Sequence, residues 1–126
     1  MKTVLVVDDC QDTTDLYGII LMGKGYKVLT ANNMQKAVEH AYTNKVDLLL
    51  TDLYLGDGMG SELAYLMGKR VPKSSILITG REEMPSAKFK DFDDYLLKPV
   101  DPDTLCKTVD ACLKLHQPEE TEALTM

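Results

Sequence analysis

The stretch TVLVVDDC, residues 3–10, places two neighbouring aspartates, Asp8 and Asp9, directly behind four apolar residues. Continuous apolar runs of this kind are typical of strands that are buried on both faces, as in a parallel sheet. Adjacent carboxylates make each other costlier to ionise, so a buried strand that ends on two of them needs a positive group nearby. The stretch therefore predicts a buried strand followed by a charged site.

Similar short runs recur along the chain between longer stretches that have helical periodicity. The predicted strands cover residues 4–7, 27–30, 48–50, 76–78 and 95–97, with 27–30 as a weaker strand at the sheet edge. The predicted helices cover residues 12–24, 33–43 and 60–70, and a last helix has Asp101 as N-cap and Pro102 at its first position. Strand and helix alternate five times, which indicates an α/β fold with a parallel sheet, helices on both faces and right-handed crossovers.

The apolar residues of the predicted helices indicate which helix faces meet the sheet. The residues expected on these faces are Leu16, Ile19, Ile20 and Met22 or Gly23 in the first helix, Ala37, Val38 and Ala41 in the second, Leu63, Leu66 and Met67 in the third, and Leu105, Val109, Cys112 and Leu113 in the last. The last helix has the clearest pattern, because its four apolar residues follow i, i+4, i+7 and i+8.

Length and composition fit one soluble domain. The chain has 126 residues, of which 44% are apolar, and this is enough for one substantial core. The segment QPEETEALTM at residues 117–126 contains a proline, three glutamates and few apolar residues. We therefore assign residues 1–117 to the domain and expect residues 118–126 to form a disordered acidic tail.

The charge balance and the cysteines bear on partners and location. With 14 Lys and Arg against 20 Asp and Glu, the net charge of -6 argues against direct binding to nucleic acid or to an anionic membrane. No apolar run approaches the ~18 residues of a membrane-spanning helix, and no signal peptide is visible. Cys10, Cys106 and Cys112 lack metal-ligand spacing, so we interpret them as reduced thiols of a cytoplasmic protein, two in helix packing and Cys10 half-buried.

Polar residues follow the ends of four predicted strands, where ligands bind in open parallel sheets. These residues are Asp8 and Asp9, Thr51 and Asp52, Thr79 and Gly80, and Lys98 and Pro99. Three carboxylates can hold Mg²⁺, and a phosphoryl group arriving there would meet the cation, an ammonium and a hydroxyl. One aspartate would then accept the phosphoryl group as an acyl phosphate. Each residue alone has an ordinary explanation, such as helix capping or a solvated charge, so the prediction depends on their conjunction.

In this order and at these strand ends, the residues resemble the receiver domain of two-component response regulators. The resemblance covers about residues 2–116, and three segments are similar to the family's usual sequences: GYKVLTA (25–31), DLLLTDLYLGDGMG (47–60) and DYLLKPV (94–100). It implies a flavodoxin-like, doubly wound, five-stranded parallel sheet with strand order 2-1-3-4-5. It also implies a signalling protein that is not an enzyme beyond its own phosphorylation and slow dephosphorylation.

The resemblance implies a role for each carboxylate. Asp52 would be phosphorylated by a sensor histidine kinase or a histidine phosphotransfer protein. Asp9 and Asp52 would ligate Mg²⁺ directly, together with the backbone carbonyl of Tyr54, and Asp8 would act mainly through water. No other cofactor is implied.

The remaining roles concern the phosphate and the response to it. Lys98 would pair with the phosphate and precede a cis bond to Pro99. Thr79 would hydrogen-bond a phosphoryl oxygen, and Tyr95 would turn inward as Thr79 moves toward the phosphate. The signal would pass to a downstream protein target, and we expect a monomer or a weak dimer.

Two departures from the family concern loops. Gly56 stands where the family usually has proline, so we expect a more mobile loop after Asp52. The segment between Thr79 and Lys98 is short for the family and carries Pro85, so we expect the family's fourth helix to be short or irregular.

Three alternatives stay open. The first is a pseudo-receiver that binds partners without phosphorylation, although the acidic residues, Thr79 and Lys98 are all present. A haloacid-dehalogenase-like phosphatase would need a second aspartate two residues beyond the nucleophile, and Asp52 is followed by Leu53 and Tyr54. A flavodoxin-like FMN carrier would need a phosphate loop after the first strand, where DDCQDTTD is acidic.

Overall fold

A computed structural model describes residues 1–67, 74–80 and 92–115 of the chain. Five parallel strands form one sheet in the order β2-β1-β3-β4-β5. The strands are β1 (Thr3–Val7), β2 (Lys27–Ala31), β3 (Leu48–Asp52), β4 (Ser74–Thr79) and β5 (Asp94–Leu97). The helices within the described residues are α1 (Gln11–Met22), α2 (Met34–Thr43), α3 (Gly60–Met67) and α4 (Pro102–Leu115). The predicted fold and strand order are confirmed.

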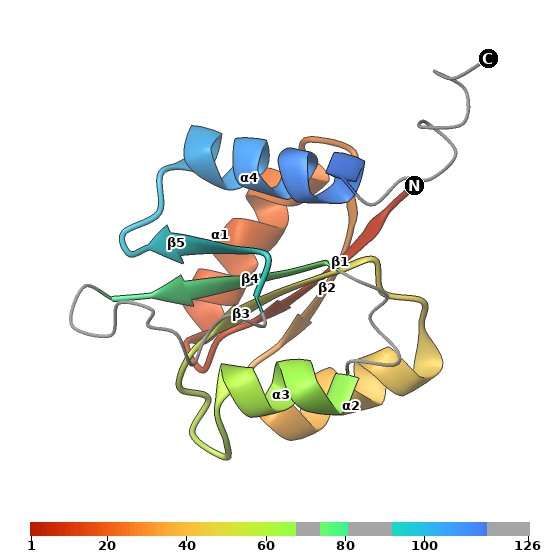
Figure 1. Ribbon diagram of the computed structural model, residues 1–126, viewed down its shortest axis with the longest axis vertical. Helices are drawn as coiled ribbons and strands as arrows, with labels where there is room; N and C mark the ends of the chain where they lie inside the picture. Colours follow the sequence, from red (N-terminus) through yellow and green to blue (C-terminus); the bar gives the residue numbers. More distant parts are fainter. Residues whose placement is uncertain (68–73, 81–91, 116–126) are drawn as a thin grey trace.

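The helices form two layers, with α1 and α4 on one face of the sheet and α2 and α3 on the other (Figure 1). Side chains alternate between the faces along β1: Val4 and Val6 join the core beneath α1 and α4, whereas Leu5 and Val7 join the core above α2 and α3. Because every residue of β1 is buried, the continuous apolar run is explained by burial on both faces.

The last helix follows its predicted pattern. It begins at Pro102, and the Asp101 carboxylate accepts a hydrogen bond from the Thr104 N–H at 3.1 Å, as an N-cap does. Its four predicted apolar residues, from Leu105 to Leu113, are all buried. In α2 the expected face is also confirmed, with Ala37 and Ala41 buried.

The predicted apolar face of α1 was wrong except at Ile20, which is half-buried and packs against the core. Leu16, Ile19 and Met22 are 55%, 65% and 55% exposed, and the helix instead buries Thr14, Tyr17, Gly18 and Leu21. The Thr14 hydroxyl donates to the Gln11 carbonyl at 2.9 Å, so its burial leaves no unpaired donor. Gly18 faces β2, where a Cβ would lie 3.6 Å from Val28, an ordinary contact distance.

Two smaller expectations were also wrong. Leu66 of α3 is 58% exposed, although Leu63 and Met67 are buried as predicted. Cys10 is exposed rather than half-buried, whereas Cys106 and Cys112 are on the buried side of α4, as expected. No helix within the described residues is both long and apolar enough to span a membrane. The expected short fourth helix of the family and the expected tail at 118–126 lie outside the described residues.

Candidate functional site

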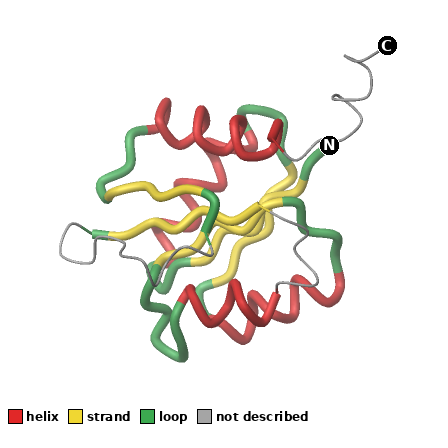
Figure 2. The backbone as a smooth tube through the Cα atoms, viewed as in Figure 1, coloured by secondary structure: helices red, strands yellow, loops and turns green. Residues whose placement is uncertain are grey.

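The carboxyl ends of β1, β3, β4 and β5 meet at one edge of the sheet, where the chain leaves the strands for loops (Figure 2). Asp52 is the last residue of β3 and lies opposite Ile78 of β4. Thr79 ends β4 and lies opposite Leu97, the residue before Lys98. The parallel register therefore brings residues that are far apart in sequence to one edge.

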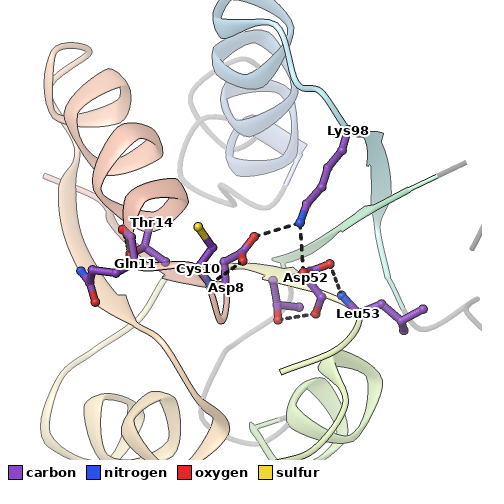
Figure 3. A network of polar contacts seen from close by, with 8 residues as sticks. Asp8, Cys10, Gln11, Thr14, Asp52, Leu53 and Lys98 are labelled. Atoms are coloured by element: carbon purple, nitrogen blue, oxygen red, sulfur yellow. Dashed lines mark hydrogen bonds and ion pairs between the residues drawn. The ribbon is translucent and has the colours of Figure 1, made fainter. Parts of the chain in front are cut away.

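Lys98 joins the first and third strand ends. Its Nζ lies 3.1 Å from Asp8 Oδ2 and 3.0 Å from Asp52 Oδ2 (Figure 3). Asp8 is 2% exposed and Asp52 is 9% exposed, so both carboxylates are nearly withdrawn from water. Lys98 is therefore the positive group beside Asp8, the first of the two aspartates that follow β1, and Asp52 shares it.

The second oxygen of each carboxylate accepts a backbone hydrogen bond. Asp8 Oδ1 accepts from the Cys10 N–H at 3.0 Å, and Asp52 Oδ1 accepts from the Leu53 N–H at 2.8 Å (Figure 3). Because each carboxylate is held at both oxygens, its plane is set before any ligand arrives.

Burial and the neighbouring charges at this edge shift the pKa values of Asp52 and Lys98. Burial raises the pKa of Asp52; the hydrogen bond and charge of Lys98 lower it, and the charge of Asp8 raises it, so the net shift is upward. Burial also opposes the charge on Lys98, but hydrogen bonds to Asp52 and Asp8 outweigh burial and raise the pKa of Lys98. Lys98 thus does not fully compensate for the burial of Asp52, and a further cation would be favoured there.

The acidic residues fit such a cation. Oxygens of Asp8, Asp9 and Asp52 lie within 4.8 Å of one another, and Asp9 is exposed at the rim. Carboxylate oxygens around a partly open position are the donor set that Mg²⁺ accepts while it keeps several waters. The predicted metal-ligating carboxylates are therefore brought together.

The other predicted residues have distinct settings. Thr79 is fully buried, its hydroxyl donates to the Gly80 carbonyl at 3.4 Å, and its own carbonyl accepts from the Lys98 N–H at 2.9 Å. Tyr95 is half-buried beside a small core of Leu53, Leu77 and Phe92. The Tyr54 side chain is 53% exposed. The predicted cis bond between Lys98 and Pro99 is present.

Tyr17 near this edge was missed by the sequence reasoning. It is 6% exposed, on the same face as Val6 and Leu50. Burial raises its pKa, Lys98 lowers it, and Asp8 and Asp52 raise it, so the phenol interacts electrostatically with the site. Tyr17 lies three residues after Thr14, on the same face of α1. A correct prediction of the buried face of α1 would therefore have included Tyr17.

Comparison with known proteins identifies the family. The family model of the response regulator receiver domain matches residues 4–110. The chain belongs to this family. Among curated relatives, this receiver domain is 35% identical over 127 residues to the response regulator PilR of Pseudomonas aeruginosa, with 97% of the chain and 28% of PilR covered. It therefore spans less than a third of that relative.

Two further comparisons involve proteins of similar length. The receiver domain is 31% identical to PilH of Pseudomonas aeruginosa, with 90% of the chain and 98% of PilH covered. The crystal structure of the response regulator TrrA of Thermotoga maritima, in complex with Mg²⁺ and BeF, matches with a TM-score of 0.80 and 27% identity, covering 89% of the chain and 99% of TrrA.

Proposed function

We propose that this receiver domain accepts a phosphoryl group on Asp52 from a sensor histidine kinase or a histidine phosphotransfer protein. The observation that carries the proposal is the shared ion pair, in which Lys98 lies 3.1 Å from Asp8 and 3.0 Å from Asp52. It supports the proposal because it brings together, at one edge of the sheet, the Asp52 carboxylate as nucleophile, the Asp8 carboxylate as a group that can help to bind a cation, and the Lys98 ammonium as a group that can bind phosphate.

The covalent step would be an in-line transfer to the Asp52 carboxylate. An Asp52 oxygen forms a bond to phosphorus as the P–N bond of phosphohistidine, or the P–O bond of acetyl phosphate, breaks. The carboxylate thereby becomes an acyl phosphate and loses its own charge. Lys98, which then keeps Asp8 as its carboxylate partner among the described residues, can pair with the phosphoryl oxygens.

The carboxylates of Asp8, Asp9 and Asp52 and the Tyr54 carbonyl would hold Mg²⁺, with Asp8 acting mainly through water. When bound, Mg²⁺ would neutralise charge on the transferring phosphoryl group. The complex of TrrA with Mg²⁺ and BeF supports this assignment by family relationship.

The response would pass through Thr79 and Tyr95 to a protein target. Support comes from the backbone bond between the Thr79 carbonyl and the Lys98 N–H at 2.9 Å, which couples the end of β4 to the phosphate-binding lysine. We infer that the protein acts in the cytoplasm as a signalling receiver and not as an enzyme acting on other substrates. A pseudo-receiver without phosphorylation is the second candidate.

The exposed apolar residues of α1 support docking of a protein partner beside the site. Leu16, Ile19 and Met22 protrude from a helix that begins two residues after Asp9. Ile19 and Met22 also border an open hollow of about 390 Å³ between α1 and β2. Apolar side chains grouped in this way are typical of interaction surfaces.

The proposal is tested with beryllofluoride, an analogue of the phosphoryl group, in the presence of Mg²⁺. We expect amide NMR shifts around Asp52, Thr79 and Lys98 in the wild type and none in Asp52→Asn. A wild type that binds Mg²⁺ but shows no shift would favour the pseudo-receiver. Sustained turnover of p-nitrophenyl phosphate would instead favour a phosphatase.

A further inference from the structure

The loop after Asp52 is tied to the start of α2 by one side chain. Asp57 Oδ1 accepts from the Met34 N–H at 2.8 Å, and Asp57 Oδ2 accepts from the Gln35 N–H at 3.2 Å. These two amides belong to the first turn of the helix, where backbone donors lack partners within the helix. A carboxylate from another loop therefore caps this helix from outside.

The cap suits a negative charge. The hydrogen bond from Met34 lowers the pKa of Asp57; desolvation raises it, and the hydrogen bond from Gln35 lowers it further, so the net shift is downward. The helix macrodipole places partial positive charge at the same point. The loop and α2 are also in close contact, because a Cβ at Gly58 would lie 2.7 Å from the sulfur of Met34.

The same loop orients the peptide group of Tyr54. The Leu55 N–H donates to the Gly58 carbonyl at 2.9 Å, and the Asp57 N–H donates to the Leu55 carbonyl at 2.9 Å. Tyr54 and Met59 form an isolated antiparallel bridge. Since a trans peptide is planar, a fixed Leu55 N–H also fixes the Tyr54 carbonyl on the opposite side of that plane.

The Tyr54 carbonyl takes no part in the hydrogen bonds of the turn described above. The hydrogen bonds of the bridge run from Gly60 N–H to the Leu53 carbonyl and from Leu55 N–H to the Gly58 carbonyl. Within the described residues no hydrogen bond to the Tyr54 carbonyl is formed. It therefore remains available to a ligand outside the loop.

Gly56 explains why the loop needs a side-chain anchor. Its φ is +82°, a value that proline, locked near –65°, cannot adopt. A proline therefore cannot stiffen the loop at this position in this backbone, and the bonds of Asp57 to α2 hold the loop.

Resting on the proposed function, we propose that Asp57 is a positioning residue for the cation site: by anchoring the loop to α2, it keeps the Tyr54 carbonyl directed to Mg²⁺. Asp57 acts through the Leu55–Gly58 turn and does not touch the cation. Loss of the anchor leaves the three carboxylates in place but frees the Tyr54 carbonyl to rotate away.

The matched variants are Asp57→Ala, Asp57→Asn and Asn33→Ala. Asn33 caps the same helix by accepting from the Lys36 N–H at 2.8 Å, but it has no bond to the loop among the described contacts. Asn33→Ala therefore weakens the start of α2 without releasing the loop. Asp57→Asn keeps one oxygen acceptor and loses the charge.

Mg²⁺ affinity is measured by calorimetry, and amide hydrogen exchange is followed at Leu55. We expect Asp57→Ala to weaken Mg²⁺ binding at least about threefold. Loss of a residue that orients a metal ligand typically costs about 10- to 100-fold in metal affinity. The effect here should be smaller because Asp57 is exposed. Exchange at Leu55 should speed up in parallel. Asp57→Asn should fall between Asp57→Ala and the wild type, and Asn33→Ala should bind Mg²⁺ like the wild type.

Two results would overturn the inference alone: unchanged Mg²⁺ affinity in Asp57→Ala, or an equal loss in Asn33→Ala, which would indicate a general effect of α2. Mg²⁺ binding that is absent from the wild type, or unaffected by Asp52→Asn, would overturn the proposed function and the inference with it.

Discussion

The helices α1 and α4 cover the same face of the sheet, yet they use their apolar residues differently. In α4 the residues from Leu105 to Leu113 that repeat at helical spacing are buried. In α1 the large apolar residues Leu16, Ile19 and Met22 are exposed, and the helix buries a different set of residues, Thr14, Tyr17, Gly18 and Leu21. The spacing of apolar residues thus identifies an apolar face of a helix, but it does not show that this face is the one that packs against the sheet.

The largest effect is expected in α4. Leu105 is fully buried among the residues of β4 and α1 that form one core, so Leu105→Ala should lower the free energy of unfolding by about 3 kcal/mol. Urea denaturation measures this. A loss below about 1 kcal/mol would mean that α4 contributes no more than an exposed helix.

A second prediction concerns the hydrogen bond that joins the two helices. The Tyr26 hydroxyl, in the turn after α1, donates to the Asp110 carboxylate of α4. Tyr26→Phe should cost about 1 kcal/mol, a charge-assisted bond reduced for partial exposure. Urea denaturation at neutral pH measures the loss, and an unchanged stability would mean that the bond does not connect the helices.

The same bond predicts a pH dependence. Burial, then the hydrogen bond and charge of Asp110, raise the pKa of Tyr26 above its ordinary 10.0. The unfolded chain therefore loses the phenol proton first, so this stabilisation is present below about pH 10 and declines above it. The difference in stability between wild type and Tyr26→Phe should shrink between about pH 9 and 11; a constant difference would contradict the shift.

Gly18 offers a change in the opposite direction. A Cβ at this position would meet Val28 at 3.6 Å and Thr30 at 3.7 Å, both ordinary contact distances. Alanine is favoured over glycine in a helix interior by about 0.5–1 kcal/mol, so Gly18→Ala should raise the thermal midpoint. A lowered midpoint would show that α1 packs more tightly against β2 than described.

The smallest effect on stability is expected on the outer face of α1. Ile19→Ala should change the free energy of unfolding by less than about 0.5 kcal/mol, because Ile19 is 65% exposed. The same variant should weaken binding of the cognate kinase or phosphotransfer protein, measured by calorimetry. A loss near that of Leu105→Ala would remove the contrast between the helices.

Much of the architecture followed from local patterns. Runs such as Val4–Leu5–Val6–Val7 predict doubly buried strands because continuous apolarity in a short segment is typical of them, and Asp101 with Pro102 locates the start of α4. The edge of the sheet that carries Asp8, Asp52 and Lys98 then follows from the parallel arrangement alone.

The contacts that were not predicted depend on distances between elements. Spacing cannot show that Lys98 lies between Asp8 and Asp52, nor that Asp57 reaches the amides of Met34 and Gln35. The buried face of α1 was missed because Thr14 and Gly18 add no hydrophobicity to a sequence pattern, although both are buried.

The most direct test of the phosphoacceptor assignment is intact mass after incubation with acetyl phosphate. With Mg²⁺, the wild type should gain one phosphoryl group, about 80 Da, and it should gain none when Mg²⁺ is removed or in Asp52→Asn. A folded, Mg²⁺-bound wild type that gains nothing and also fails to bind beryllofluoride, or an Asp52→Asn variant that gains the same mass, would contradict the account.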